Sequence, residues 1–381
     1  MRVAYFNANL CKGQDGVTRV MYKMFEGAIM RKVEALAFTS TLPEVSDMIV
    51  PMVRVPSVPL FLQKNYRLAL PSYHLFARKL TQFQPDLIHI NSPCTLGFRA
   101  MKYARHFNIP IVATYHTHFP TYPRYYNLSG LEELIWKISR HLYNNIDRTF
   151  VPTEPILEEL RDHGINNLQY LPNGVDLQLF NPRYRSEEWR ERIGAKHKPV
   201  VLFVSRLVWE KDLRVLAEAY RILRAKRDDF EFVIVGSGSA RTEFEQMVPG
   251  AHFLGYQSGR ELTETYASSD IFVFPSTTET FGLVTVEAMA SGLVPVAAKV
   301  GGAAGIIEEG HSGLFAKPFD AADIARQVER LLDSPDWRKA LALQALHRAQ
   351  EFGWDQILET LFNNYGHVID EFRHKRHSRA A

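Results

Sequence analysis

The sequence predicts an α/β protein made of two Rossmann-like domains, each built on a parallel sheet. The chain has 381 residues, which is more than one hydrophobic core usually serves. Short apolar runs alternate with helical patterns in both halves. These runs are continuous in Val, Ile and Phe, as is typical of parallel strands that are buried on both faces. We therefore expect an N-terminal domain over residues 1–180, a C-terminal domain over 181–365 and a basic tail over 366–381 whose helix end packs on or near the first domain.

The predicted elements follow the same scheme in each half. In the first half the strands are RVAYFNA (2–8), PDLIHINS (85–92) and IPIVATYH (109–116), with helices over 17–29 and 95–107. In the second half the strands are PVVLFVSR (199–206), FEFVIVGSGS (230–239), HFLGY (252–256), DIFVFPS (270–276) and VPVAAKVGG (294–302), with helices between them. Segment 171–194 is the predicted junction, and 352–372 is a closing helix. Ligands of such sheets bind beyond the carboxyl ends of the strands, so the polar residues there are the candidates.

Composition narrows the class of protein. A formal net charge of +3 argues against a dedicated nucleic-acid-binding protein. The first 180 residues carry 19 basic and 14 acidic side chains, so this half could favour an anionic membrane surface or simply carry solvated charge. Two cysteines suggest no disulfide framework and fit a reducing cytoplasm. Without an apolar run of about 18 residues, membrane contact would be peripheral, at the inner face.

Two cations follow the strand 199–206. Arg206 ends that strand and Lys211 lies five residues later, near the start of the next helix. An arginine can hold a diphosphate in a bidentate way, while a lysine acts as a point charge. The pair is therefore a candidate diphosphate site, although two surface cations would give the same pattern.

The glycines after strand 230–239 do not form a dinucleotide fingerprint. Gly236 and Gly238 fit G-x-G, but Arg241 stands where the third glycine belongs. A nicotinamide enzyme is therefore not expected. We predict instead that Gly236 lets a nucleotide lie close to the backbone.

The segment STTETFGLVTVEAMASG (276–292) carries two carboxylates around a predicted helix start. Phe281, Gly282 and Leu283 open the helix, where free N–H groups bind phosphate. Glu279 and Glu287 would repel a phosphate, so we expect them to accept hydrogen bonds from sugar and ribose hydroxyls. A cation partner is the competing explanation. Together these features predict a site for a nucleotide that carries a sugar on its diphosphate.

These segments resemble a known family. ETFGLVTVE resembles the E-x7-E signature of retaining glycosyltransferases of family 4. Other segments also resemble this family, namely SRLVWEKD, LPNGVD, ASSDIFVFPSTTETFG and EAMASGLVPVAAKVGG. In the first half, SPCTLGFRAMKYARHFNIPIVATYHTHFPTYPRYY is similar to the branch that contains sulfoquinovosyl diacylglycerol synthases and GDP-mannose-dependent mannosyltransferases. The resemblance runs from about residue 1 to about residue 365.

The resemblance implies the GT-B fold, with two facing domains, the donor held mainly by the second, the acceptor by the first, and a last helix that crosses back. It implies that Arg206 and Lys211 bind the donor diphosphate. Glu279 would contact the transferred sugar, and Glu287 the ribose. The backbone of residues 281–283 would hold sugar and phosphate.

The resemblance also implies roles for two further residues. Gly16 would let the first domain approach the donor, and His116 would lie beside the reaction centre. The chain departs from many relatives at Asp15, where a glycine is common, and at Asp212, which we expect to affect only helix capping. His116 and His118 could suggest a metal, but no further ligands cluster nearby and no D-x-D motif occurs, so neither metal nor cofactor is expected.

The implied reaction is hexose transfer from a UDP- or GDP-linked sugar to a hydroxyl acceptor, with retention and without a protein nucleophile. Aromatic and basic residues in 55–71 and 119–136, among them Tyr122, Arg124, Tyr125 and Trp136, suit a membrane interface and hence a lipid or glycan acceptor. Packing of these rings on the domain is the alternative. A nucleotide-sugar 2-epimerase and a non-catalytic nucleotide-sugar-binding protein are the rival functions.

Overall fold

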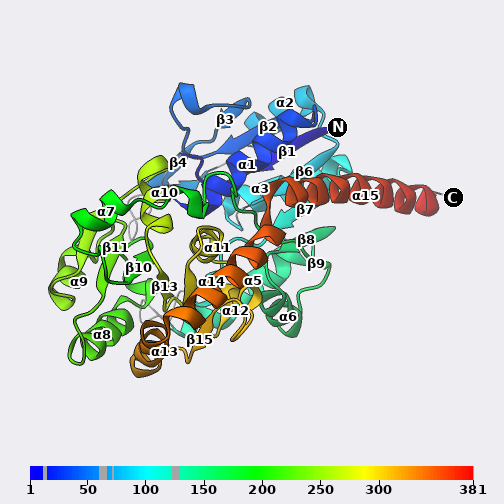
Figure 1. Ribbon diagram of the computed structural model, residues 1–381. Helices are drawn as coiled ribbons and strands as arrows, with labels where there is room; N and C mark the ends of the chain where they lie inside the picture. The colour runs from blue at the N-terminus through cyan, green and yellow to red at the C-terminus, as the bar shows by residue number, and fades with distance from the viewer. Residues whose placement is uncertain (12–14, 60–66, 71–72, 92, 122–128, 381) are drawn as a thin grey trace. The chain divides into compact units, whose positions relative to one another are not determined.

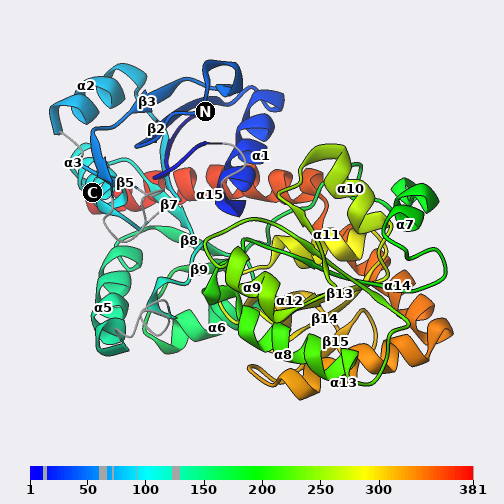
Figure 2. The same cartoon turned by 90° about the vertical axis from the view of Figure 1, so that its left-hand side faces the viewer.

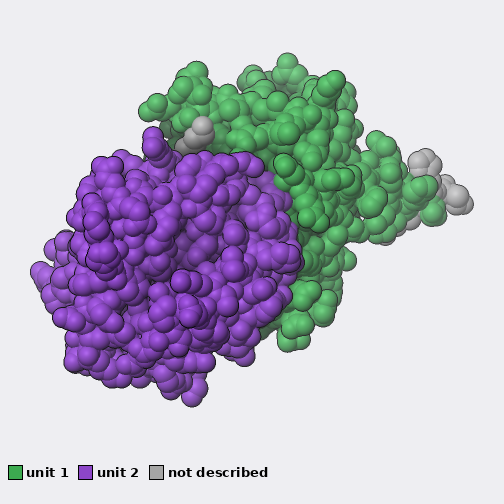
Figure 3. Space-filling model, in the orientation of Figure 1, with its two compact units in different colours: residues 1–120, 130–172, 355–381 green, residues 121–129, 173–354 purple. Residues whose placement is uncertain are grey.

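The protein divides into two compact units, shown in Figure 3. The computed structural model describes residues 1–11, 15–59, 67–70, 73–91, 93–121 and 129–380. The first unit comprises residues 1–120, 130–172 and 355–381, and the second comprises 121–129 and 173–354. Each contains a parallel sheet with helices in the connections, so the predicted α/β class with two Rossmann-like domains is confirmed.

The first unit is built on a seven-stranded sheet in the order β3-β2-β1-β6-β7-β8-β9, with every pair parallel. Its strands are β1 (Arg2–Phe6), β2 (Glu34–Thr39), β3 (Met52–Arg54), β6 (Leu87–Ile90), β7 (Ile111–Thr114), β8 (Arg148–Val151) and β9 (Leu168–Tyr170). An antiparallel pair, β4 (Ser57–Pro59) and β5 (Arg67–Ala69), lies outside this sheet. Its helices are α1 (Gly16–Met30), α2 (Tyr73–Phe83), α3 (Thr95–Phe107), α5 (Glu132–Tyr143), α6 (Glu154–Asp162) and α15 (Trp354–Ala380), coloured as in Figure 1.

The second unit repeats this plan with six parallel strands in the order β12-β11-β10-β13-β14-β15. The strands are β10 (Val200–Val204), β11 (Glu231–Val235), β12 (His252–Gly255), β13 (Ile271–Phe274), β14 (Val294–Ala298) and β15 (Leu314–Ala316). The helices are α7 (Glu187–Arg192), α8 (Leu213–Arg224), α9 (Arg241–Met247), α10 (Gly259–Ala267), α11 (Leu283–Ala290), α12 (Gly301–Ile306), α13 (Ala321–Asp333) and α14 (Pro335–Ala349). In both sheets the strand order reverses direction once, between β1 and β6 and between β10 and β13. Such switch points are where doubly wound sheets bind ligands.

The division of the chain differs from the predicted boundaries. The first unit gives way to the second after Pro172 rather than after residue 180, and residues from Asp355 onward belong to the first unit. The reason is α15, which continues without a break through the predicted boundary at 365/366. Its Leu358, Phe362 and Tyr365 are buried, so the residues before 366 already pack with the first unit.

Helix α15 lies along the first unit from α1 to β8 (Figure 2). Leu358 packs against Gly27 of α1 so closely that a Cβ there would lie 3.0 Å from it. Farther along, the Tyr365 hydroxyl lies 2.5 Å from His89 Nδ1, and Arg148 donates two hydrogen bonds of 3.0 Å to Glu371. The helix is therefore fixed by both apolar packing and polar contacts.

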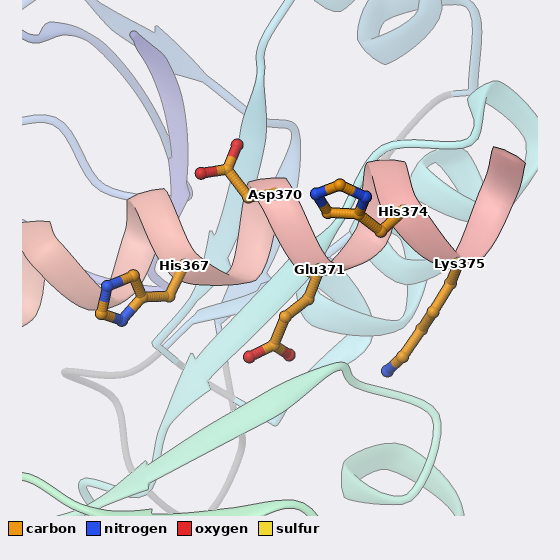
Figure 4. Close-up of a pocket in the computed structure, with 5 residues that line it drawn as sticks. All are labelled: His367, Asp370, Glu371, His374 and Lys375. Atoms are coloured by element: carbon orange, nitrogen blue, oxygen red, sulfur yellow. The ribbon is translucent and has the colours of Figure 1, made fainter.

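A shallow hollow of about 450 Å³ lies along α15, lined by His367, Asp370, Glu371, His374 and Lys375 (Figure 4). Asp370 points to the opposite side of the helix from Glu371 and Lys375, so these side chains do not converge on one point. Within the described part of the chain, no helix is long and apolar enough to pass through a membrane.

Candidate active site

The polar loops that follow β10 and β13 meet at the switch point of the second sheet. The two strands pair in parallel, with Val201 opposite Ile271, so their carboxyl ends lie at the same edge. Arg206 follows β10 by two residues and is half-buried. Lys211 ends a short 3-10 helix, Trp209–Lys211, and Glu279 lies in the loop between β13 and α11. The structure therefore brings together the second-half residues that the sequence singled out.

Lys211 and Glu279 form an ion pair at this edge. Lys211 is only 7% exposed, and its Nζ lies 2.5 Å from Glu279 Oε1 and 3.4 Å from Thr278 Oγ1. The cation partner that the sequence left open as an alternative for Glu279 is thus present in the ligand-free chain. Removing one partner of a buried pair leaves the other charge uncompensated, which is costly. An incoming anion can instead take over the lysine and leave the carboxylate for hydroxyl donors.

Asp212 joins the two loops and does not cap its helix, so the capping role predicted for it is wrong. The residue precedes α8 in the left-handed conformation (φ 55°), and its side chain makes no capping bond. Instead, its Oδ2 accepts hydrogen bonds of 2.9 Å from both the backbone N–H and the hydroxyl of Thr277. Burial raises the pKa of the Asp212 carboxyl. The residue therefore fixes the loop that carries Glu279 to the loop that carries Lys211.

The start of α11 offers backbone groups rather than side chains. Gly282 precedes the helix with φ 92°, which is accessible to glycine and strained for other residues. The ring of Phe281 is buried and lies edge-to-face on Phe352, with centroids 5.6 Å apart. Only the main chain of residues 281–283 is thus available for the predicted phosphate and sugar contacts. Free N–H groups at a helix start suit an anion.

Glu287 already has a donor within the protein. It is 4% exposed, and its Oε2 accepts a hydrogen bond of 3.2 Å from the Tyr266 hydroxyl. This contact holds α11 to α10 and orients the carboxylate. The ribose contact expected of Glu287 stays a prediction.

Gly236 has a structural reason to be glycine. It has φ 140°, and a Cβ at this position would lie 1.8 Å from the carbonyl oxygen of Ser205. Its N–H donates to Gly255 O at 2.7 Å. The loops after β10 and β11 therefore touch through this residue, which places Arg206 beside the closest approach. Its predicted role toward a nucleotide stays a prediction.

The first unit holds Gly16 and His116 at the carboxyl edge of its own sheet. Gly16 is the first residue of α1, and the Asp15 carboxylate caps this helix by accepting from Thr18 N–H at 2.7 Å. His116 follows β7, and its Nε2 lies 3.1 Å from Asn91 Oδ1 at the end of β6. Burial lowers the pKa of His116 to about 4, so the ring is neutral near pH 7.

His118 serves a structural purpose. Its Nδ1 lies 2.9 Å from the Tyr115 hydroxyl and its Nε2 lies 3.1 Å from Glu159 Oε1 on α6. Its ring also contacts the face of Trp136. Among the described residues, no three His, Cys, Asp or Glu side chains are grouped so as to hold a metal ion.

Comparison with known proteins identifies the family. Residues 14–179 match the family described as Glycosyltransferase Family 4, and residues 185–348 match the one described as Glycosyl transferases group 1. The GDP-mannose-dependent alpha-mannosyltransferase of Corynebacterium glutamicum is 32% identical over 97% of this chain and 89% of its own length. The chain belongs to glycosyltransferase family 4.

Other relatives of this family 4 glycosyltransferase differ in the activities that their names give. Sulfoquinovosyl transferase SQD2 of Arabidopsis thaliana is 37% identical over 78% of this chain, which spans 60% of that longer protein. The alpha-monoglucosyldiacylglycerol synthase of Streptococcus pneumoniae is 26% identical over 82% of this chain and 76% of its own length. The solved sucrose-phosphate synthase from Thermosynechococcus elongatus is 20% identical, with a TM-score of 0.81 over 97% of this chain and 99% of that one. The fold is therefore GT-B, and the enzyme transfers a sugar from a nucleotide donor.

Sequence reasoning missed four contact residues of this glycosyltransferase. They are Asn91, Tyr266, Thr277 and Thr278. Asn91, Thr277 and Thr278 each follow a strand, so their position was the available signal. Tyr266 lies inside α10, and no sequence pattern links it to Glu287.

Proposed function

We propose that this glycosyltransferase moves a hexose from a UDP- or GDP-linked donor to a hydroxyl group, with retention and without a metal ion. The observation that carries the proposal is the partly buried Lys211–Glu279 pair at the carboxyl ends of β10 and β13, beside the start of α11. It combines a desolvated cation for a diphosphate with a carboxylate for sugar hydroxyls. Low local polarity strengthens both interactions.

In the proposed reaction, Lys211 and Arg206 stabilise the charge that develops on the leaving diphosphate, together with N–H groups at the start of α11. The bond between the anomeric carbon and the phosphate oxygen breaks, and a bond from the same carbon to the acceptor oxygen forms on the same face. The proton of the acceptor hydroxyl leaves with the diphosphate. Preorganised charges of this kind replace the electrostatic work that a metal ion performs elsewhere.

The donor base is distinguished by thermal shift with UDP, GDP and ADP. A ligand that binds the folded protein raises its melting temperature, by an amount equivalent to about 2.7 kcal/mol at one hundred times Kd. We expect UDP or GDP to stabilise the protein and ADP to have little effect. With the matching sugar nucleotide, NMR of the product should show the same anomeric configuration as the donor. Inversion, or release of an epimerised nucleotide sugar, would contradict the proposed reaction.

We also propose that the acceptor is a lipid or a glycan presented at an anionic membrane surface, on the cytoplasmic side. The relatives named for sulfoquinovosyl transfer and for monoglucosyldiacylglycerol synthesis support a glycolipid product. Trp136 does not take part, because it is 3% exposed and stacks on His163, so its predicted interface role is wrong. Tyr122, Arg124 and Tyr125 lie outside the described residues.

Helix α5 offers a different surface for this contact. Leu131, Leu134 and Ile138 are exposed at helical spacing, and Lys137 and His141 are exposed beside them. Apolar side chains beside a lysine suit the boundary of an anionic bilayer. In sedimentation with vesicles of anionic phospholipid at low salt, the L134S/I138S variant should bind more weakly than the unaltered enzyme. Failure of the unaltered enzyme to sediment with vesicles would remove the membrane from the proposal.

A further inference from the structure

The ring of His116 is held by a residue to which no role has been assigned. Asn91 is the first residue after β6 and is 2% exposed. Its backbone N–H donates to Phe6 O on β1 at 2.9 Å, which fixes the position of its Cα. Its side-chain Oδ1 lies 3.1 Å from His116 Nε2, while its amide nitrogen is buried with no partner among the described residues.

An unpaired buried amide costs stability, on the order of 1–3 kcal/mol for a typical buried donor. A buried asparagine with a satisfied core role would use both ends of its amide. Here only the oxygen is used, and it faces the histidine. The side chain is therefore better suited to orienting His116 than to stabilising the unit.

The rest of the segment after β7 is anchored independently of Asn91. On one side, His118 is held by Tyr115 and Glu159. On the other side, Thr114 Oγ1 lies 2.8 Å from His89 Nε2, and His89 Nδ1 lies 2.5 Å from the Tyr365 hydroxyl of α15. The backbone on both sides of His116 is thus fixed without Asn91, so the contact with Asn91 bears on the orientation of the ring and the position of its proton.

We propose that Asn91 is a positioning residue of the transfer reaction, whose amide oxygen accepts from His116 Nε2–H and so fixes the tautomer and orientation of that ring. The tautomer of a histidine is set by the hydrogen bond that one of its nitrogens makes. This inference rests on the proposed function and on the expectation, drawn from the family resemblance, that His116 lies beside the reaction centre. Asn91 acts through His116 and does not itself contact the substrate.

His89 interacts electrostatically with His116, and Tyr365 contacts His89. His118, two residues after His116, contacts Glu159. Burial, and secondarily the charge of His116, lowers the pKa of His89 well below its ordinary range, so His89 is neutral near pH 7. Tyr365 is buried and its pKa is raised. Neither His89 nor Tyr365 changes charge near neutrality, so a substitution at Asn91 should alter the titration of His116 without interference from these two groups.

The test compares N91L, N91D, H116A and N91L/H116A, with N166L as the control because Asn166 is an exposed asparagine of the same unit. Removing the acceptor in N91L should lower kcat about tenfold or more with little change in the donor KM, as expected when a histidine loses its orienting partner. The same change should have no effect in the H116A background. N91L activity losses that persist undiminished without His116 would overturn the proposal.

The second readout is the titration of His116, followed by NMR and assigned by its absence in H116A. N91D keeps an acceptor for Nε2–H but adds a carboxylate, which favours the charged ring, so the titration midpoint of His116 should rise by at least one pH unit. The midpoint of the acid limb in the pH profile of kcat should rise by a similar amount. An unchanged midpoint in folded N91D contradicts the proposal. If H116A keeps full turnover, the expected role of His116 in the reaction is contradicted, while the titration still reports on the Asn91 contact.

Discussion

Replacing Lys211 by alanine is expected to lower kcat by about a thousandfold or more, the effect of removing a preorganised charge from a developing anion. The Lys211 ammonium is 7% exposed and pairs with Glu279 at the sheet edge where we propose that the diphosphate binds. The loss should appear in kcat more than in the donor KM, since the charge develops as the diphosphate leaves. Initial rates at saturating donor measure it.

Lys226 provides the matched control. It forms an ion pair with Glu329 in the same unit, with Nζ 3.1 Å from a carboxylate oxygen, but this pair is exposed. K226A should therefore keep nearly full activity and stability, because exposed pairs contribute about 0–1 kcal/mol. Near-normal turnover of K211A, with folding confirmed by circular dichroism, would contradict the assignment of Lys211.

Replacing Gly236 by alanine is expected to destabilise the second unit by about 3 kcal/mol or more, the range of changes that force the backbone to move. The new Cβ would lie 1.8 Å from Ser205 O, and φ 140° is strained for alanine. Because Arg206 directly follows Ser205, a shift of this loop should lower the nucleotide affinity as well. Urea denaturation and nucleotide titration measure the two effects.

Gly310 is the control that distinguishes the steric clash with Ser205 from the strain of a positive φ. It also has positive φ (72°) in the second unit, but a Cβ there would meet no atom within 4 Å. G310A should cost only about 1–2 kcal/mol, the penalty for a left-handed alanine, and should leave nucleotide affinity unchanged. Equal losses from G236A and G310A would show that the contact with Ser205 has no importance.

The architecture could be predicted because buried parallel strands are continuous apolar runs. Segments such as VVLFV and IFVF have apolar side chains on both faces, and both faces are buried when the strand lies between two helical layers. The strands β9 and β15 have only three residues each, too few for their pattern to stand out. The boundary after Pro172 depends on tertiary packing, which residue spacing does not encode, and the return of α15 was expected only from the family resemblance.

The places of the candidate residues after strands could be predicted, but the contacts between these residues could not. Lys211 and Glu279 were each identified from their places after strands, yet their pairing needed the fold to bring loops 68 positions apart together. The same limitation explains two errors. Asp212 has the residue type of a cap but binds Thr277, and Trp136 has the type of an interface residue but packs on His163.

The most direct test of the central claim is a calorimetric titration with UDP and GDP in the presence of EDTA, repeated with Mg²⁺. If Lys211 and the start of α11 hold the diphosphate, one of these nucleotides should bind the unaltered enzyme with the same Kd in both buffers. Its binding to K211A should be at least tenfold weaker. Binding that requires Mg²⁺, or that K211A retains in full, would contradict the account.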